Sequence, residues 1–178
     1  MELIPLDDDS LIELGARWLS EKRNRKWLDL GGGEKPIGAM ALRIMTKNDA
    51  HIIRAFTADD DGGPIGLVAL SSVNRDFRAA VLWALLGDRR YAGKGYLYRS
   101  TSAMLTLGFD VHGLECVNAW ALESNQASLR ILKKLNFRPI GRQRHGRDGE
   151  GEPFDRLLFE LQAGEHRSPD VHPRITAA

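Results

Sequence analysis

The stretch Arg90-Tyr91-Ala92-Gly93-Lys94-Gly95 joins an apolar run to a longer amphipathic segment, and this junction decides the fold. The run before it, residues 80–86 (AVLWALL), is short and apolar, which predicts a buried strand. The segment after it, residues 96–111, carries apolar residues near helical spacing and predicts a helix. Glycines at a helix start let an anion approach the first backbone N–H groups, and the helix dipole attracts it. The stretch therefore predicts a diphosphate-binding turn between a strand and a helix.

A second motif lies further along the chain, at Asn125-Gln126-Ala127-Ser128, and is followed by residues 129–135 and then by Asn136-Phe137. Together the two motifs resemble the signature segments of the GNAT superfamily of acyl-CoA-dependent N-acetyltransferases. The glycine stretch is similar to the R/Q-x-x-G-x-G/A coenzyme A loop of that family. The second motif resembles the N-x-x-S … L-x-F pattern of its ribosomal-protein N-terminal (Rim-type) branch. The resemblance covers residues 65–161, more than half of the chain.

The resemblance implies an α/β (α+β) fold with a mixed, centrally splayed β-sheet flanked by helices. The hydrophobic pattern predicts a matching order, a β-meander followed by β-α-β-α-β-β. Strands are expected at residues 1–6, 51–56, 65–73, 78–86, 114–122, 138–145 and 154–161, and helices at 10–20, 23–30, 36–46, 96–111 and 125–135. Ser10 is the expected cap of the first helix, and Pro36 is expected in the first turn of the third.

One domain accounts for the chain, because 178 residues can bury a substantial core. We expect a single acetyltransferase domain over residues 1–162. Residues 163–178 hold two prolines and many polar side chains, which predicts a mobile tail.

Charge and composition limit the kinds of partner and the cellular compartment that we expect for this protein. The net charge of +1 does not favour nucleic acid or an anionic membrane as a partner. No apolar run approaches the length of a membrane span, and Cys116 is the single cysteine, which fits a reducing compartment. We expect a cytoplasmic protein without a metal ion, and we include a homodimer among the expected assemblies.

The resemblance implies that acetyl-CoA is the co-substrate and that coenzyme A enters between the strands ending near Leu86 and Leu122. Arg90 and Lys94 would add charge to the amides of the loop, although both could also be solvated surface cations. A backbone N–H near Leu85 or Leu86 would polarise the thioester carbonyl. The residues expected to contact coenzyme A are Leu85, Leu86, Arg90, Tyr91, Ala92, Gly93, Lys94, Gly95, Tyr96, Asn125 and Ser128.

The resemblance also suggests catalytic residues. Ser128 is the candidate for assisting departure of the thiolate, and Asn125 for bonding the pantetheine arm. Each has a structural alternative, since Asn125 is a good helix cap and Ser128 can bond its own backbone. Many family members carry a tyrosine acid seven residues after the motif asparagine, where this chain has Leu132. That departure favours the Rim-type branch.

The general base has several candidates. Glu123 ranks first and His145 second, and His112 has a suitable intrinsic pKa. Asp155 matches a recurrent aspartate of the family, although a structural salt bridge explains it equally well.

The segment of residues 18–27 is where the family usually builds the acceptor wall. It holds Trp18, Trp27 and the basic run at residues 22–26. Buried tryptophans beside a solvated basic face are the alternative reading. If the run lines the site, it favours an acceptor with an acidic or phosphate group.

The expected function is transfer of an acetyl group from acetyl-CoA to a primary amine by direct attack in a ternary complex. The acceptor is a protein N-terminus or a small-molecule amine. The alternative is a non-catalytic acyl-CoA sensor with the same fold, which Leu132 and the lack of one obvious base favour.

Overall fold

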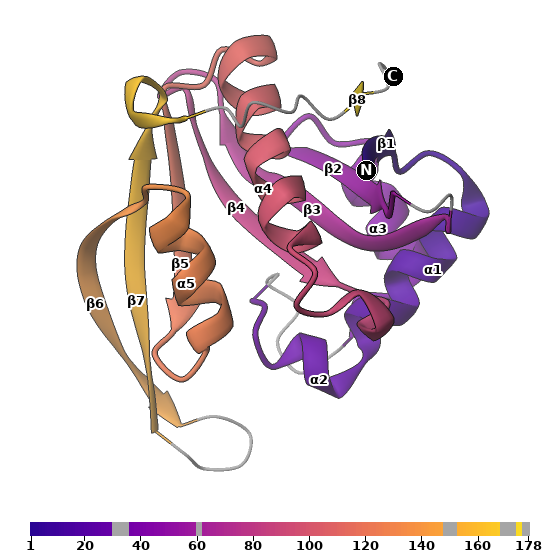
Figure 1. Cartoon of the computed structure of the whole chain (residues 1–178), viewed down its shortest axis with the longest axis horizontal. Coiled ribbons are helices and arrows are strands. Elements are labelled where there is room, and N and C mark those ends of the chain that lie inside the picture. The colour runs from indigo at the N-terminus through magenta and orange to yellow at the C-terminus, as the bar shows by residue number, and fades with distance from the viewer. Residues whose placement is uncertain (30–35, 60–61, 148–152, 168–173, 176–178) are drawn as a thin grey trace.

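The computed structural model describes residues 1–29, 36–59, 62–147, 153–167 and 174–175. Its centre is an eight-stranded sheet in the order β6-β7-β5-β4-β3-β2-β1-β8 (Figure 1). The strands are β1 (Glu2–Pro5), β2 (His51–Thr57), β3 (Pro64–Asn74), β4 (Ala79–Leu86), β5 (Cys116–Leu122), β6 (Arg138–Arg147), β7 (Pro153–Gln162) and β8 (Arg174–Ile175). The helices are α1 (Asp9–Ser20), α2 (Lys22–Arg25), α3 (Ala39–Thr46), α4 (Tyr96–Thr106) and α5 (Gln126–Lys134). The mixed sheet flanked by helices confirms the expected fold class.

Two helix starts differ from the sequence-based expectation. Asp8, and not Ser10, caps α1: its carboxylate accepts hydrogen bonds from the backbone N–H groups of Ser10 and Leu11. Ser10 therefore falls inside the first turn. Helix α3 begins at Ala39 after an extended Gly38, so Pro36 precedes the helix instead of forming its first turn.

The sheet splays at its centre. The parallel strands β4 and β5 pair only where Ala79, Ala80 and Val81 face Cys116, Val117 and Asn118. Beyond Val81 the two strands diverge toward Leu86 and Leu122, while each stays paired with its outer neighbour. Figure 1 shows α4 and α5 side by side in front of the diverging strands. The splay confirms the arrangement that the family resemblance implies.

Two hydrophobic clusters cover the two faces of the sheet. One joins α4 and α5 to the sheet, with Met104, Leu105 and Leu132 among its buried side chains. The other joins α1 and α3 to the opposite face, with Ile12 and Leu42 at its centre. Because alternate residues of β4 face opposite sides, this one strand contributes to both clusters.

Trp18 belongs to the core, which agrees with the alternative reading of buried tryptophans beside a solvated basic face. It is 7% exposed and packs against Gly87, the first residue after β4. A Cβ atom at Gly87 would lie well inside contact distance of the Trp18 indole ring. The absence of a side chain at this position lets α1 support the start of the glycine loop.

Replacement of Gly87 by alanine is expected to lower the free energy of unfolding by about 1–3 kcal/mol, because the core must shift to admit the methyl group. Urea denaturation measures the loss. Gly38→Ala is the matched control, because a Cβ there meets nothing within 4 Å. Equal stability of the two variants would contradict this packing.

The segment after β7 contains two short elements among its described residues. Residues 163–165 form a 3-10 turn with a capping box between Gln162 and Glu165. Arg174 and Ile175 pair in parallel with Glu2 and Leu3 of β1. The rest of residues 168–178 lies outside the described part, so the expected domain boundary and mobile tail stay predictions.

Candidate active site

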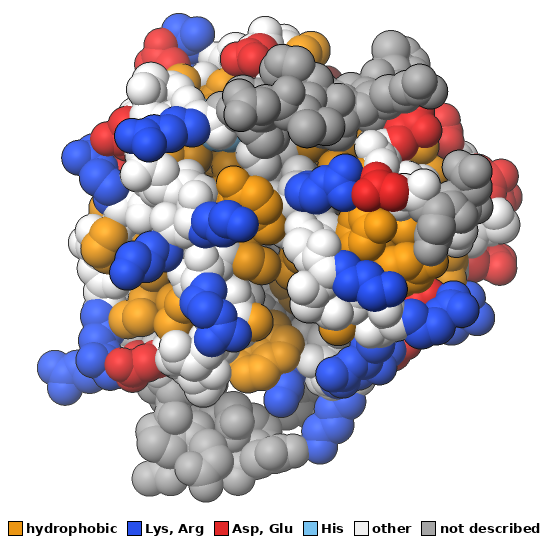
Figure 2. All heavy atoms as spheres, viewed as in Figure 1, with side chains coloured by type: hydrophobic (Ala, Val, Ile, Leu, Met, Phe, Trp, Pro, Cys, Tyr) orange, Lys and Arg blue, Asp and Glu red, His pale blue; other side chains and the backbone are white. Residues whose placement is uncertain are grey.

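A cavity of about 470 Å³ passes through the splay between β4 and β5. On one face of the sheet it reaches α4 and α5, and on the other it reaches the segment after α2, α3 and the start of β2. Figure 2 shows Lys and Arg side chains over α2 and the loop before α4, at the open end of the splay. The residues that line the cavity include Trp27, Asp29, Met45, His51, Ser71, Trp83, Ala84, Leu97, Thr101, Trp120, Asn125, Ser128, Leu132 and Arg156.

The glycine loop presents unpaired backbone donors at the start of α4. Gly93 and Gly95 have φ angles of +76° and +83°, in the left-handed region that glycine adopts without strain. A Cβ on either would meet nothing within 4 Å, so the loop is open on that side. Among the described residues, nothing accepts a hydrogen bond from the N–H groups of Gly93, Gly95 or Tyr96. These donors and the positive end of the α4 dipole fit a diphosphate.

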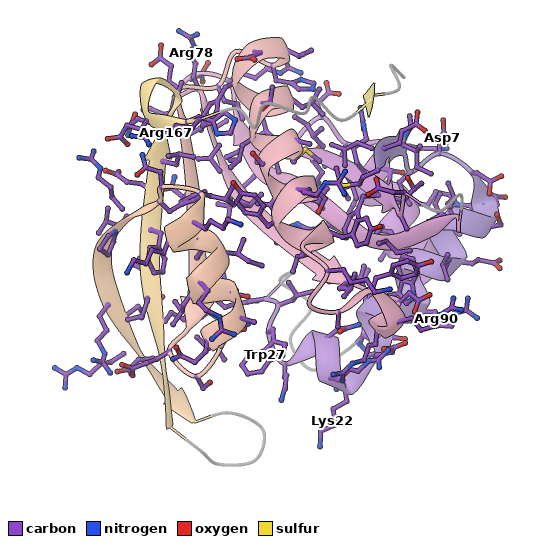
Figure 3. All side chains as sticks on the ribbon, viewed as in Figure 1. Asp7, Lys22, Trp27, Arg78, Arg90 and Arg167 are labelled. Atoms are coloured by element: carbon purple, nitrogen blue, oxygen red, sulfur yellow. The ribbon has the colours of Figure 1, made fainter. Side chains whose placement is uncertain are left out.

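The two loop cations differ in their surroundings. Arg90 donates to the Asp88 carboxylate at 2.6 Å, and this hydrogen bond lowers the pKa of Asp88. Figure 3 shows Arg90 on the outer side of the loop. Lys94 lies over the ring of the buried Tyr91, with its Nζ 5.0 Å from the ring centroid. Since Asp88 offsets the charge of Arg90, Lys94 is the stronger candidate for a charge contact with an anion.

The backbone donors of β4 are divided between β3 and the splay. Gly87 N–H donates to the Ile65 carbonyl at 2.9 Å, and antiparallel pairing alternates along a strand. Leu85 therefore also directs its N–H toward β3, whereas Ala84 and Leu86 direct theirs into the gap. Of the two donors expected from the sequence, Leu86 faces the splay and Leu85 does not.

Asn125 and Ser128 stand together in the first turn of α5. The Asn125 side-chain oxygen accepts a hydrogen bond from Ser128 N–H at 3.2 Å, so Asn125 does cap the helix. Asn125 and Ser128 both line the cavity. Within the described part of the chain the Ser128 hydroxyl makes no hydrogen bond, and the back-bonded alternative for this serine is not observed. The hydroxyl is therefore available to a ligand.

A tyrosine acid is missing from this cavity. Leu132 is buried at 6% exposure where many family members have tyrosine. Tyr91, Tyr96 and Tyr98 are all described, and none lines the cavity. With apolar Leu132 in place of a tyrosine, Ser128 in the first turn of α5 remains the candidate hydroxyl for assisting departure of the thiolate.

The structure places the expected bases away from the cavity or leaves them undescribed. Glu123 is exposed, pairs with Arg142 at 2.6 Å and does not line the cavity. Arg142 also pairs with Asp155, which agrees with the structural interpretation of that aspartate. His145 lies in β6 opposite Phe154, and its side chain is outside the described atoms. His112 lines a different cavity. We therefore do not retain Glu123 as the base.

An ion pair belongs to the lining of the cavity. Arg156 of β7 pairs with Asp29 at 2.7 Å, and its guanidinium lies 4.3 Å from the centroid of the Trp120 ring. Figure 3 shows Trp27 between α2 and α5, at the open end of the splay. Trp27 thus lines the cavity, while the basic run at residues 22–26 is not part of its lining.

His51 is a functional candidate that sequence reasoning missed. Its Nδ1 lies 3.0 Å from Ser71 Oγ, and Trp83 Nε1 donates to the same oxygen at 2.8 Å. Both His51 and Ser71 line the cavity. The sequence offers only polar residues within two largely apolar strands, a pattern that on its own indicates no chemistry.

The splayed mixed sheet, with two helices beside the gap, defines the class of the GNAT acetyltransferases. The family model of the acetyltransferase (GNAT) domain matches residues 1–138, and the chain belongs to this family. It is an acyl-CoA-dependent N-acetyltransferase. Enzymes of this family generally use acetyl-CoA as the acyl donor.

Individual relatives show how far the likeness extends. The spermidine N(1)-acetyltransferase of Escherichia coli K12 is 27% identical over 144 residues, which cover 76% of either chain. A dodecameric spermidine N-acetyltransferase of Vibrio cholerae superposes with a TM-score of 0.73 at 15% identity, covering 92% of both chains. The ribosomal-protein-S5-alanine acetyltransferase of Vibrio fischeri gives 0.71 at 18% identity, covering 90% of this chain and 92% of that one. The two structures support the fold.

The described helices and acidic side chains bear on membrane spanning and on metal binding. In the described part of the chain, every helix is too short or too polar to span a bilayer. Among the same residues, no group of three or more His, Cys, Asp or Glu side chains is arranged to hold a metal ion.

Proposed function

We propose that this chain binds acetyl-CoA through the glycine loop and the splay, and transfers the acetyl group to a primary amine carried on an apolar or aromatic body. The observation that carries this proposal is the continuity of the cavity. It joins Leu97 and Ser128, beside the expected donor site, to Trp27 and His51 on the opposite face of the sheet. An amine and a thioester can therefore meet inside one continuous cavity.

The donor would be held by main-chain groups. The N–H groups of Gly93, Gly95 and Tyr96 would bond the diphosphate, and Lys94 would add charge. The pantetheine amides would extend β4 along the splay, because Ala84 and Leu86 direct backbone donors into the gap. Leu86 or Ala84 would then polarise the thioester carbonyl.

The transfer needs no acyl-enzyme. The amine nitrogen attacks the thioester carbon directly, the N–C bond forms, and the C–S bond breaks. Ser128 would donate a hydrogen bond to the sulfur as negative charge develops there. A thiolate is a stable enough leaving group that hydrogen-bond stabilisation can replace a tyrosine acid.

The charge of the cavity supports an acceptor with one amine on an apolar body. Trp27, Trp83 and Trp120 supply aromatic surface. Among the described lining residues, Asp29 is the only carboxylate, and it is paired with Arg156. A polyamine carries several positive charges, and the described lining offers them no carboxylate besides the one already paired with Arg156. An N-terminal residue of a peptide or a small aromatic amine fits this lining better.

A polyamine acceptor is the second candidate, because the curated relative at 27% identity acts on spermidine. Release of free thiol from acetyl-CoA distinguishes the two. The panel would contain phenethylamine, a dipeptide amide with an aromatic first residue, and spermidine. We expect the first two to give a kcat/KM at least tenfold above that of spermidine. A preference for spermidine would contradict the acceptor assignment, and coenzyme A binding without turnover of any amine would favour the sensor alternative.

A further inference from the structure

His51 opens onto two cavities and has no role in the steps described so far. It is the first residue of β2, it is half-buried, and it lines the active-site cavity. It also lines a second cavity of about 460 Å³, together with Arg54 and Arg75. A proton on the imidazole can therefore be exchanged with either space.

A hydrogen-bonded row fixes the orientation of the ring. His51 lies opposite Ser71 in the antiparallel pairing of β2 and β3. Indole nitrogen only donates, so Ser71 Oγ accepts from Trp83 and has a second lone pair that can accept from His51 Nδ1–H, the tautomer in which Nε2 is the free acceptor. Nε2 has no hydrogen-bond partner among the described residues. The row holds one ring nitrogen and leaves the other for a substrate.

The electrostatic setting favours a neutral imidazole that releases a captured proton readily. Burial lowers the pKa of His51, which favours the neutral imidazole. The charged and titratable side chains that line the two cavities around it are Asp49, Arg54, Arg75, Arg78 and His112 in the second cavity, and Asp29 and Arg156 in the active-site cavity. Burial is the cause of the lowered pKa of His51, and it disfavours retention of a positive charge on the ring.

We propose that His51 is the general base of the reaction, accepting the proton that the acceptor ammonium loses and passing it to solvent through the second cavity. This proposal rests on the function proposed above. The ammonium transfers one proton to His51 and becomes a neutral amine, whose lone pair forms the N–C bond. The C–S bond then breaks, the second nitrogen proton ends on the coenzyme A sulfur, and the imidazolium releases its proton. Ser71 acts as a positioning residue.

His51→Gln tests the proposal through a pH profile of kcat/KM with the best amine of the panel. In the wild type we expect kcat/KM to rise through a pKa below 6.5 and then stay level, because deprotonated His51 takes the ammonium proton. In the variant we expect a loss of about 100-fold at pH 7, in the range of general-base catalysis. Its activity should then keep rising with pH toward the pKa of the amine, since only free amine can react.

His166→Gln is the matched control. His166 is also half-buried, its pKa is also lowered by burial, and its Nε2 lies 2.9 Å from the hydroxyl of Thr106. It lines neither cavity, and its variant should keep the wild-type pH profile. A second variant, Ser71→Ala, keeps the imidazole but loses its orientation, and should lose about tenfold in kcat without loss of coenzyme A affinity.

The outcomes separate this inference from the proposed function. If wild-type protein turns over an amine while His51→Gln and Ser71→Ala keep its rate and its level pH profile, His51 is not the base and the proposed function stands. If wild-type protein turns over no amine, both are wrong. Coenzyme A binding by each variant shows that it has folded.

Discussion

Replacement of Gly93 by aspartate is expected to raise the dissociation constant of coenzyme A by about 10- to 100-fold. The proposed hydrogen bonds from this turn go to a charged diphosphate, and each such bond contributes about 1.5–3 kcal/mol. An aspartate at residue 93 would place a carboxylate beside that anion. Since aspartate tolerates a φ of +76° better than most residues, the fold should survive. Isothermal titration with coenzyme A measures the effect.

Gly113→Asp controls for charge and for backbone strain. Gly113 also has a positive φ, of +64°, and it lies just beyond the helical segment that continues α4, away from the helix start. A carboxylate there should leave coenzyme A affinity within about twofold of wild type, since charges beyond about 10 Å are largely screened at 0.1 M salt. Equal affinities of the two variants would remove the glycine loop from donor binding.

Replacement of Ser128 by alanine is expected to lower kcat by about 10- to 100-fold, with little change in coenzyme A affinity. Ser128 lines the cavity and its hydroxyl makes no hydrogen bond within the described residues, so its proposed contact forms as charge develops on sulfur. An interaction made mainly in the transition state affects kcat more than binding. Steady-state thiol release combined with titration of coenzyme A separates the two quantities.

Ser124→Ala is the control for Ser128. Ser124 lies in the exposed turn between β5 and α5 and does not line the cavity. Its variant should keep wild-type turnover. An unchanged kcat in Ser128→Ala would return that serine to a purely structural role in α5.

Sequence reasoning predicted the order of the elements well because hydrophobic period and turn residues are local signals. Helix starts were less reliable, since Asp8 and Ser10 are both good caps and only the fold decides between them. The splay came from the family resemblance alone. Nothing in the apolar runs at residues 80–86 and 116–122 indicates that two paired strands part after Val81.

Some parts of the candidate site also have a local sequence signal, and others do not. The glycine loop and the Asn125–Ser128 turn are contiguous in sequence, so a motif could identify them. The acceptor end is assembled from distant segments: Asp29 meets Arg156, and His51 meets Ser71. Such pairs leave no local pattern, which is why the sequence offered Glu123 as a candidate base and did not offer His51, the residue proposed here.

A structure of the chain with coenzyme A tests the proposed donor site directly. We expect the diphosphate on the backbone N–H groups of Gly93, Gly95 and Tyr96, with the pantetheine arm between β4 and β5 and the sulfur near Ser128. Diphosphate density at another surface, or a splay that stays empty at saturating coenzyme A, would contradict it.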